Sequence, residues 1–121
     1  MINKILLIIL SLASLMISAQ VNPENYAKSI TSEELRGLLY TFASDYFSGR
    51  ETGEKGQKIA VDFLRDYYIS HGISSAKNTD DFFQKMILEI KGEKVKTENV
   101  VAIIPGSVKP DEYIIISAHL D

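Results

Sequence analysis

The 121-residue chain contains no cysteine. This absence excludes disulfides, thiolate metal sites, a thiol nucleophile and a lipidated N-terminal cysteine. The sequence also has no excess of positive charge, because 13 Lys and Arg residues stand against 16 Asp and Glu, for a net charge of −3. No Lys/Arg-rich run occurs. Since a basic patch is the usual footprint of nucleic-acid binding, the composition gives no support for a nucleic-acid partner.

No apolar run in the sequence has the length of about 20 residues that a membrane-spanning helix needs. The longest, residues 5–17, has 13 residues, follows Lys4 and precedes the small residues Ser18 and Ala19. This three-part pattern predicts a secretory signal peptide over residues 1–19, and hence export to the periplasm or outside the cell. After its removal no membrane contact is expected. A buried N-terminal helix or a membrane anchor is the alternative.

Residues 20–30 are expected to form an exposed lead-in to the folded part of the chain. A first helix is predicted from the capping box Thr31-Ser32-Glu33-Glu34 to about Ser44. A second helix is predicted from about residue 54–56 to His71-Gly72, where glycine suits the left-handed backbone of a helix end. Three strands are then predicted, separated by Gly- and Pro-containing turns, at residues 82–90, 97–104 and 113–118.

The last predicted strand differs from the other two. Ile114-Ile115-Ile116 is apolar on both faces of an extended chain. Strands that are buried on both faces belong to sheets covered by helices on both sides. The order of two helices and three strands therefore predicts the opening portion of an α/β domain.

His119 and Asp121 follow this apolar strand and are separated by one residue. Residues i and i+2 of an extended segment point the same way, so both side chains can reach one point beyond the strand. An imidazole is a natural metal ligand at neutral pH. A carboxylate beside it can accept the other ring N–H and fix its tautomer and direction. The alternative is an ordinary strand end with polar residues that face water.

Four stretches of the sequence, taken in order, resemble the zinc-dependent exopeptidases of metallopeptidase family twenty-eight. The stretch FSGRETGEKGQKIAVDFLRDYYISHGI is similar to the family's Gly-Arg-x-x-Gly-x-x-Gly loop and the helix after it. The stretch FFQKMILEI is similar to its Phe-Gln strand, and TENVVAIIPGS to its Asn-Val strand and turn. The stretch DEYIIISAHLD is similar to the strand that delivers the first metal ligand. The resemblance covers roughly residues 30–121.

The resemblance implies a mixed, mostly parallel sheet between layers of helices, so residues 31–121 would be the N-terminal part of a three-layer sandwich. It implies two zinc ions at the carboxyl edge of that sheet and removal of single residues from the ends of peptide or protein substrates. His119 matches the first zinc ligand, and Asp121 matches the aspartate that braces that imidazole without binding metal. The other metal ligands and the general base lie downstream in the family. We therefore expect a truncated product or fragment that is inactive, or nearly so, by itself.

Three other interpretations stay open at this point. A related carboxypeptidase or glutaminyl cyclase would share the implied fold. A non-catalytic secreted binding module would give His119-Leu120-Asp121 no role. Arg50 is expected to pair with Asp45 or Glu51 or to cap carbonyl groups, with a substrate carboxylate as its alternative partner. His71 is expected to interact with the last carbonyls of its helix and not with metal. The sequence leaves the oligomeric state unknown.

Overall fold

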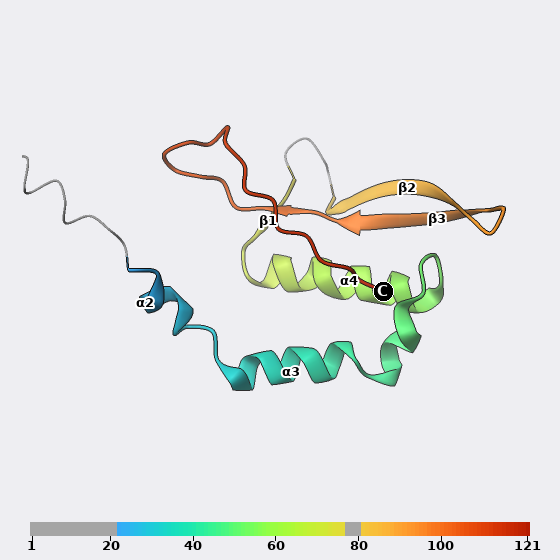
Figure 1. Cartoon of the computed structure of the whole chain (residues 1–121), viewed down its shortest axis with the longest axis horizontal. Helices are drawn as coiled ribbons and strands as arrows, with labels where there is room; N and C mark the ends of the chain where they lie inside the picture. The colour runs from blue at the N-terminus through green and yellow to red at the C-terminus, as the bar shows by residue number, and fades with distance from the viewer. Residues whose placement is uncertain (1–21, 77–80) are drawn as a thin grey trace, which may run out of the picture. The chain divides into compact units, whose positions relative to one another are not determined.

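A computed structural model describes residues 22–76 and 81–121 (Figure 1). The chain divides into two units, residues 1–37 and residues 38–121, which are described separately. The predicted signal peptide and the start of the lead-in lie outside the described residues. Within the described part of the chain, no helix is long and apolar enough to cross a membrane.

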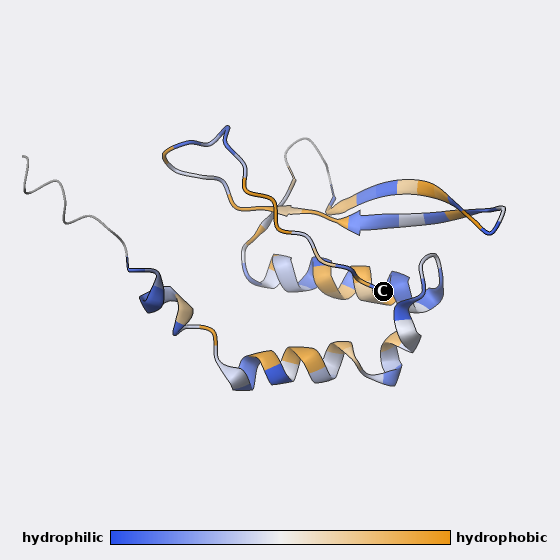
Figure 2. Cartoon of the chain, in the orientation of Figure 1, coloured by the Kyte–Doolittle hydropathy of each residue, from blue (hydrophilic) through white to orange (hydrophobic). Residues whose placement is uncertain are grey.

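The described part of the first unit contains a short helix and the start of a longer one. Helix α2 (Pro23–Ala27) begins at Asn22, whose side-chain oxygen accepts a hydrogen bond of 2.9 Å from the Glu24 amide. Helix α3 (Ser32–Phe42) begins after Thr31, whose hydroxyl oxygen accepts from the Glu34 amide at 3.1 Å. The predicted start of this helix is therefore confirmed. Hydrophobic and hydrophilic residues alternate along this helix in Figure 2, and Leu35 and Leu39 are exposed.

The core of the second unit is aromatic and small. Phe47 lies in the short 3₁₀ segment η2 (Asp45–Arg50) and is completely buried. Its ring centroid lies 5.1 Å from that of Phe42 and 5.4 Å from that of Phe63 in helix α4 (Lys55–Ser70). Such tilted and edge-on contacts suit the quadrupole of aromatic rings. Gly56, Gln57, Ala60 and Val61 form the buried face of this helix.

Helix α4 ends as the sequence predicts. Gly72 adopts the left-handed conformation, with φ of +67°. The Nδ1 atom of His71 lies 2.8 Å from the carbonyl oxygen of Tyr67, and the two rings lie 4.1 Å apart. His71 thus contacts a carbonyl of the last turn, which confirms its structural interpretation.

The longest strands form one antiparallel hairpin. Strand β2 (Phe83–Ile90) pairs with strand β3 (Glu93–Val100) in a register that runs from Phe83–Val100 to Ile90–Glu93. Lys91 and Gly92 both have positive φ, which is the requirement of the two-residue turn that best fits strand twist. Strand β3 packs on α4, where the Lys58 ammonium lies 2.9 Å from the Glu98 carboxylate.

The predicted three-layer α/β sandwich with a mostly parallel sheet is wrong. The described strands form two sheets of two strands each, and every pair is antiparallel. The predicted strand 97–104 is divided, since β3 ends at Val100 and β4 (Ala102–Ile103) pairs instead with β1 (Ser74–Ser75). A parallel pair needs a long crossover connection, whereas β2 and β3 are joined by a two-residue turn.

The predicted strand 113–118 has no strand partner among the residues described. Ile114, Ile115 and Ile116 are 94%, 87% and 92% exposed. The apolar character of both faces predicted burial between helical layers, but no layer formed by the described residues covers either face. The segment 113–118 is instead an exposed, uncharged run that belongs to no helix or strand, and it contains three consecutive isoleucines.

We predict that replacing Gly56 by Ala destabilises the second unit. A methyl group at Gly56 would overlap the carbonyl oxygen of Phe47, which is backbone and cannot rotate away. Overpacking of this kind costs about 1–3 kcal/mol. The matched control is Gly37→Ala in α3, where nothing lies within 4 Å of the added methyl, so the helix should gain about 0.5–1 kcal/mol. Thermal and urea unfolding of the two variants measure the difference, and equal stability would contradict the packing of α4 on η2.

We also predict that the segment 113–118 causes self-association of the 121-residue chain. Exposed runs with high β-propensity, no charge and no proline favour pairing between chains. Ile115→Lys should therefore lower the fraction of oligomer in sedimentation velocity. Val108→Lys adds the same charge at an exposed site outside the segment and should have little effect. If both variants lower the oligomer fraction equally, the added charge and not the segment 113–118 controls self-association.

Candidate functional site

The structure brings His119 and Asp121 together. The Nδ1 atom of His119 lies 3.3 Å from the Oδ1 atom of Asp121. The His119 side chain is 93% exposed, so its other nitrogen, Nε2, faces water. The two side chains meet, as the spacing of i and i+2 suggested, although the segment that carries them belongs to no strand.

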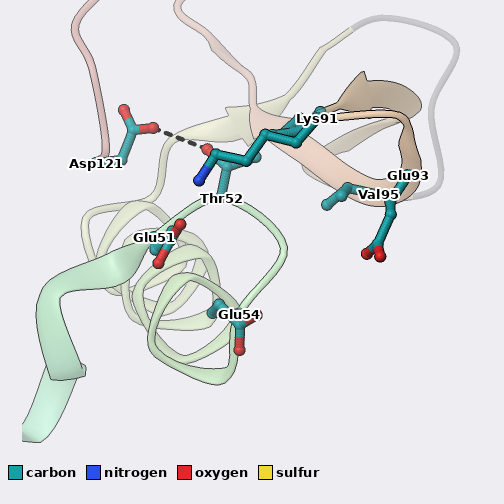
Figure 3. A pocket seen from close by; sticks show the side chains of 8 residues that line it. Glu51, Thr52, Glu54, Lys91, Glu93, Val95 and Asp121 are labelled. Atoms are coloured by element: carbon teal, nitrogen blue, oxygen red, sulfur yellow. Dashed lines mark hydrogen bonds between the residues drawn. The ribbon is translucent and has the colours of Figure 1, made fainter.

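Thr52 holds the other oxygen of the same carboxylate. Its hydroxyl donates a hydrogen bond of 2.8 Å to the Oδ2 atom of Asp121, across 69 residues of sequence (Figure 3). This bond, followed by the contact with His119, lowers the pKa of the Asp121 carboxyl below its ordinary value. The carboxylate therefore stays ionised, and able to accept a ring N–H, at lower pH than a free aspartate. Sequence reasoning missed Thr52, because one hydroxyl in a polar loop carries no pattern.

Arg50 anchors the backbone of the same tripeptide. Its Nε–H donates to the carbonyl oxygen of Leu120 at 2.8 Å, and its Nη1–H donates to the carbonyl oxygen of Phe42 at 2.6 Å. The guanidinium carbon also lies 4.6 Å from the centre of the Phe42 ring. The expectation that Arg50 caps carbonyl groups is thus confirmed. The planar fork of arginine allows both bonds at once.

The segment that carries Arg50 and Thr52 runs from the end of η2 into the loop before α4 and has an unusual backbone. Ser48, Gly49 and Arg50 all have positive φ, of 48°, 78° and 61°. For residues with a Cβ the left-handed conformation costs about 1–2 kcal/mol each. Gly53 also has positive φ, and a Cβ at this position would overlap the Val95 side chain of β3. The loop is therefore tightly fixed between η2, α4 and the hairpin.

An open hollow of about 460 Å³ lies beside Asp121. The loop after η2 and the hairpin turn line it (Figure 3), and its lining residues are Glu51, Thr52, Glu54, Ile90, Lys91, Glu93, Val95 and Asp121. Four of these side chains are acidic and one is basic. The hollow therefore favours a cationic group over an anionic one.

His119, Asp121 and the residues around them do not form a complete zinc site. A catalytic zinc takes three protein ligands and a water molecule. His119 offers one nitrogen, while both oxygens of Asp121 contact His119 and Thr52. Across residues 22–76 and 81–121, no group of three His, Cys, Asp or Glu side chains could hold a metal ion. A metal at His119 would need ligands from other residues.

Comparisons of the chain with protein-family models, curated proteins and solved structures found no match.

We predict that the 121-residue chain does not bind zinc tightly by itself. A single exposed imidazole should give no saturable binding with a Kd below about 1 µM, or about −8 kcal/mol. Isothermal titration with zinc chloride near neutral pH measures this directly. The His119→Ala variant should give the same trace. One-to-one binding at submicromolar Kd that His119→Ala removes would show that the chain supplies more ligands than its geometry indicates.

Proposed function

We propose that this chain is part of an exported, zinc-dependent aminopeptidase-like exopeptidase, in which His119 is a metal ligand and Asp121 orients its ring. One observation carries the proposal. The Asp121 carboxylate lies against Nδ1 of His119 and leaves Nε2 exposed, which is the arrangement that prepares an imidazole to bind a metal. The four sequence stretches that resemble this family, in order along residues 30–121, support it. Export rests on the signal-peptide pattern of residues 1–19.

The proposal has no support from the sheet, because the described strands form two antiparallel pairs and residues 113–121 belong to neither. It rests on the contact between His119 and Asp121 and on the order of the four sequence stretches that resemble the family. In such an enzyme the metal would polarise the scissile carbonyl and activate water. Of the residues that this chain supplies, His119 contributes one nitrogen and Asp121 its orientation. On this proposal the remaining ligands and the general base come from outside residues 22–121, and the isolated chain is inactive.

The charge around Asp121 favours an aminopeptidase over a carboxypeptidase. Glu51, Glu54, Glu93 and Asp121 line the hollow, and Lys91 is the one basic residue among the described residues that line it. A free α-amino group carries positive charge below its pKa of about 8, whereas a terminal carboxylate is negative. The hollow would attract the amino end of a peptide and repel the carboxyl end.

The test is an exopeptidase assay of the protein produced from its complete gene. We expect hydrolysis of a free amino-acid 4-nitroanilide but not of its N-acetylated form. We expect 1,10-phenanthroline to abolish the activity and zinc to restore it. His119→Ala should lower kcat/KM by roughly 100-fold or more, and Asp121→Asn by about 10–100-fold, the usual effect of losing an orienting partner of a metal ligand.

The second histidine supplies the matched control. His71 contacts the last turn of α4, so His71→Ala should leave kcat/KM near the wild-type value. Hydrolysis of substrates with a free carboxyl end instead would identify a carboxypeptidase. Activity that is absent, or that neither the chelator nor His119→Ala changes, would overturn the proposal and favour a binding module.

A further inference from the structure

We propose that Thr52 and Arg50 are positioning residues that fix the tautomer and direction of the His119 ring. The role of that ring as a metal ligand rests on the proposed function, but the positioning itself does not. Thr52 acts on the Asp121 carboxylate and Arg50 acts on the backbone of Leu120. Together they hold the tripeptide His119-Leu120-Asp121 at two points.

Thr52 determines which way the carboxylate faces. The Asp121 side chain is about half exposed, at 46%, so without a partner it could rotate in water. The Thr52 hydroxyl occupies Oδ2 at 2.8 Å, and Oδ1 is then left to face Nδ1 of His119 at 3.3 Å. The hydroxyl and the imidazole thus bind opposite oxygens of one carboxylate.

Arg50 determines where the backbone of the tripeptide lies. Ile114–Ile116, which precede the tripeptide, are exposed, whereas Leu120 is half-buried. The Arg50 side chain joins the Leu120 carbonyl to the Phe42 carbonyl and stacks on the Phe42 ring. The Phe42 ring in turn packs on the buried ring of Phe47. The tripeptide is therefore attached to the aromatic core through one side chain and not through a sheet.

The shape of the loop supports a positioning role. Arg50 keeps a left-handed backbone although it is not glycine. Residues held in sparsely populated conformations are found where surrounding structure fixes them, often near functional sites. Gly53 and Gly56 allow the loop to lie against Val95 and the Phe47 carbonyl. These contacts leave little freedom at Arg50 and Thr52.

The chemical consequence concerns the neutral imidazole. A neutral ring carries one proton, on either Nδ1 or Nε2, and an acceptor at one nitrogen selects the tautomer. The Asp121 carboxylate faces Nδ1, so the proton is held there. Nε2 then keeps its lone pair and faces outward. This is the form that can bind a metal ion.

The experiment measures the tautomer of His119 in the 121-residue chain by long-range ¹H–¹⁵N NMR of labelled histidine at alkaline pH. In the wild type we expect an excess of the Nδ1–H form over that of free histidine. Thr52→Val should lower the Nδ1–H to Nε2–H ratio by about two- to tenfold, which corresponds to the loss of one net hydrogen bond. Thr52→Ser keeps the hydroxyl and should restore the ratio. His71 gives an internal control in the same spectra and should not change.

A second variant tests the other point of attachment. Arg50→Lys keeps the charge but cannot span two carbonyl groups with a planar fork, so it should also lower the His119 ratio. A wild-type ratio equal to that of free histidine, or an unchanged ratio in Thr52→Val and Arg50→Lys, would overturn the proposal. The readout needs neither metal nor substrate. If the variants shift the tautomer ratio but the protein has no peptidase activity, only the proposed function is refuted. If the protein is an active peptidase but the variants leave the tautomer ratio unchanged, only the positioning role is refuted.

Discussion

The close approach of helix α4 to the backbone of η2 is the constraint on which the rest of the second unit depends. Gly56 lies against the carbonyl oxygen of Phe47, in a space that no Cβ could share. Phe47 and Ala60 are buried at this approach, and the backbone of η2 beside it is left-handed at Ser48, Gly49 and Arg50. Arg50 is the last residue of η2, and Thr52 lies in the loop between η2 and α4. Their reach to Leu120 and Asp121 is thus a consequence of helix packing and not of strand pairing.

Features set by neighbouring residues could be predicted from the sequence. The Thr31 cap, the end of α4 at Gly72 and the turn at Lys91-Gly92 each depend on a few adjacent residues. The sheet could not be predicted in the same way, because pairing depends on which distant segment supplies a partner. The Ile114–Ile116 run predicted burial from its composition alone. An apolar pattern predicts that a segment is buried, but it does not identify the other segment that must pack against it.

The candidate site likewise has features that depend on neighbouring residues and features that depend on distant ones. His119 and Asp121 could be predicted as a pair because residues i and i+2 of any extended chain share a direction, whether or not the chain joins a sheet. The capping role of Arg50 could be anticipated from its chemistry, but its partners, Leu120 and Phe42, could not. Thr52 gave no signal, since its hydrogen bond joins residues 69 positions apart. A polar loop between glycines offers many hydroxyls and carboxylates, and only the folded backbone selects one.

The geometry of the tripeptide and the topology of the sheet are therefore separable. Two hydrogen bonds hold residues 119–121 to Arg50 and Thr52, a third joins His119 to Asp121, and each is at least partly open to water. Bonds of this kind contribute only about 0.5–1.5 kcal/mol each to stability. They can order the tripeptide only because the donor groups of Arg50 and Thr52 are already fixed by the core, so that little conformational entropy is lost on contact. Loosening the packing of Phe47 under α4 should for this reason disorder the His119–Asp121 pair before it unfolds the hairpin.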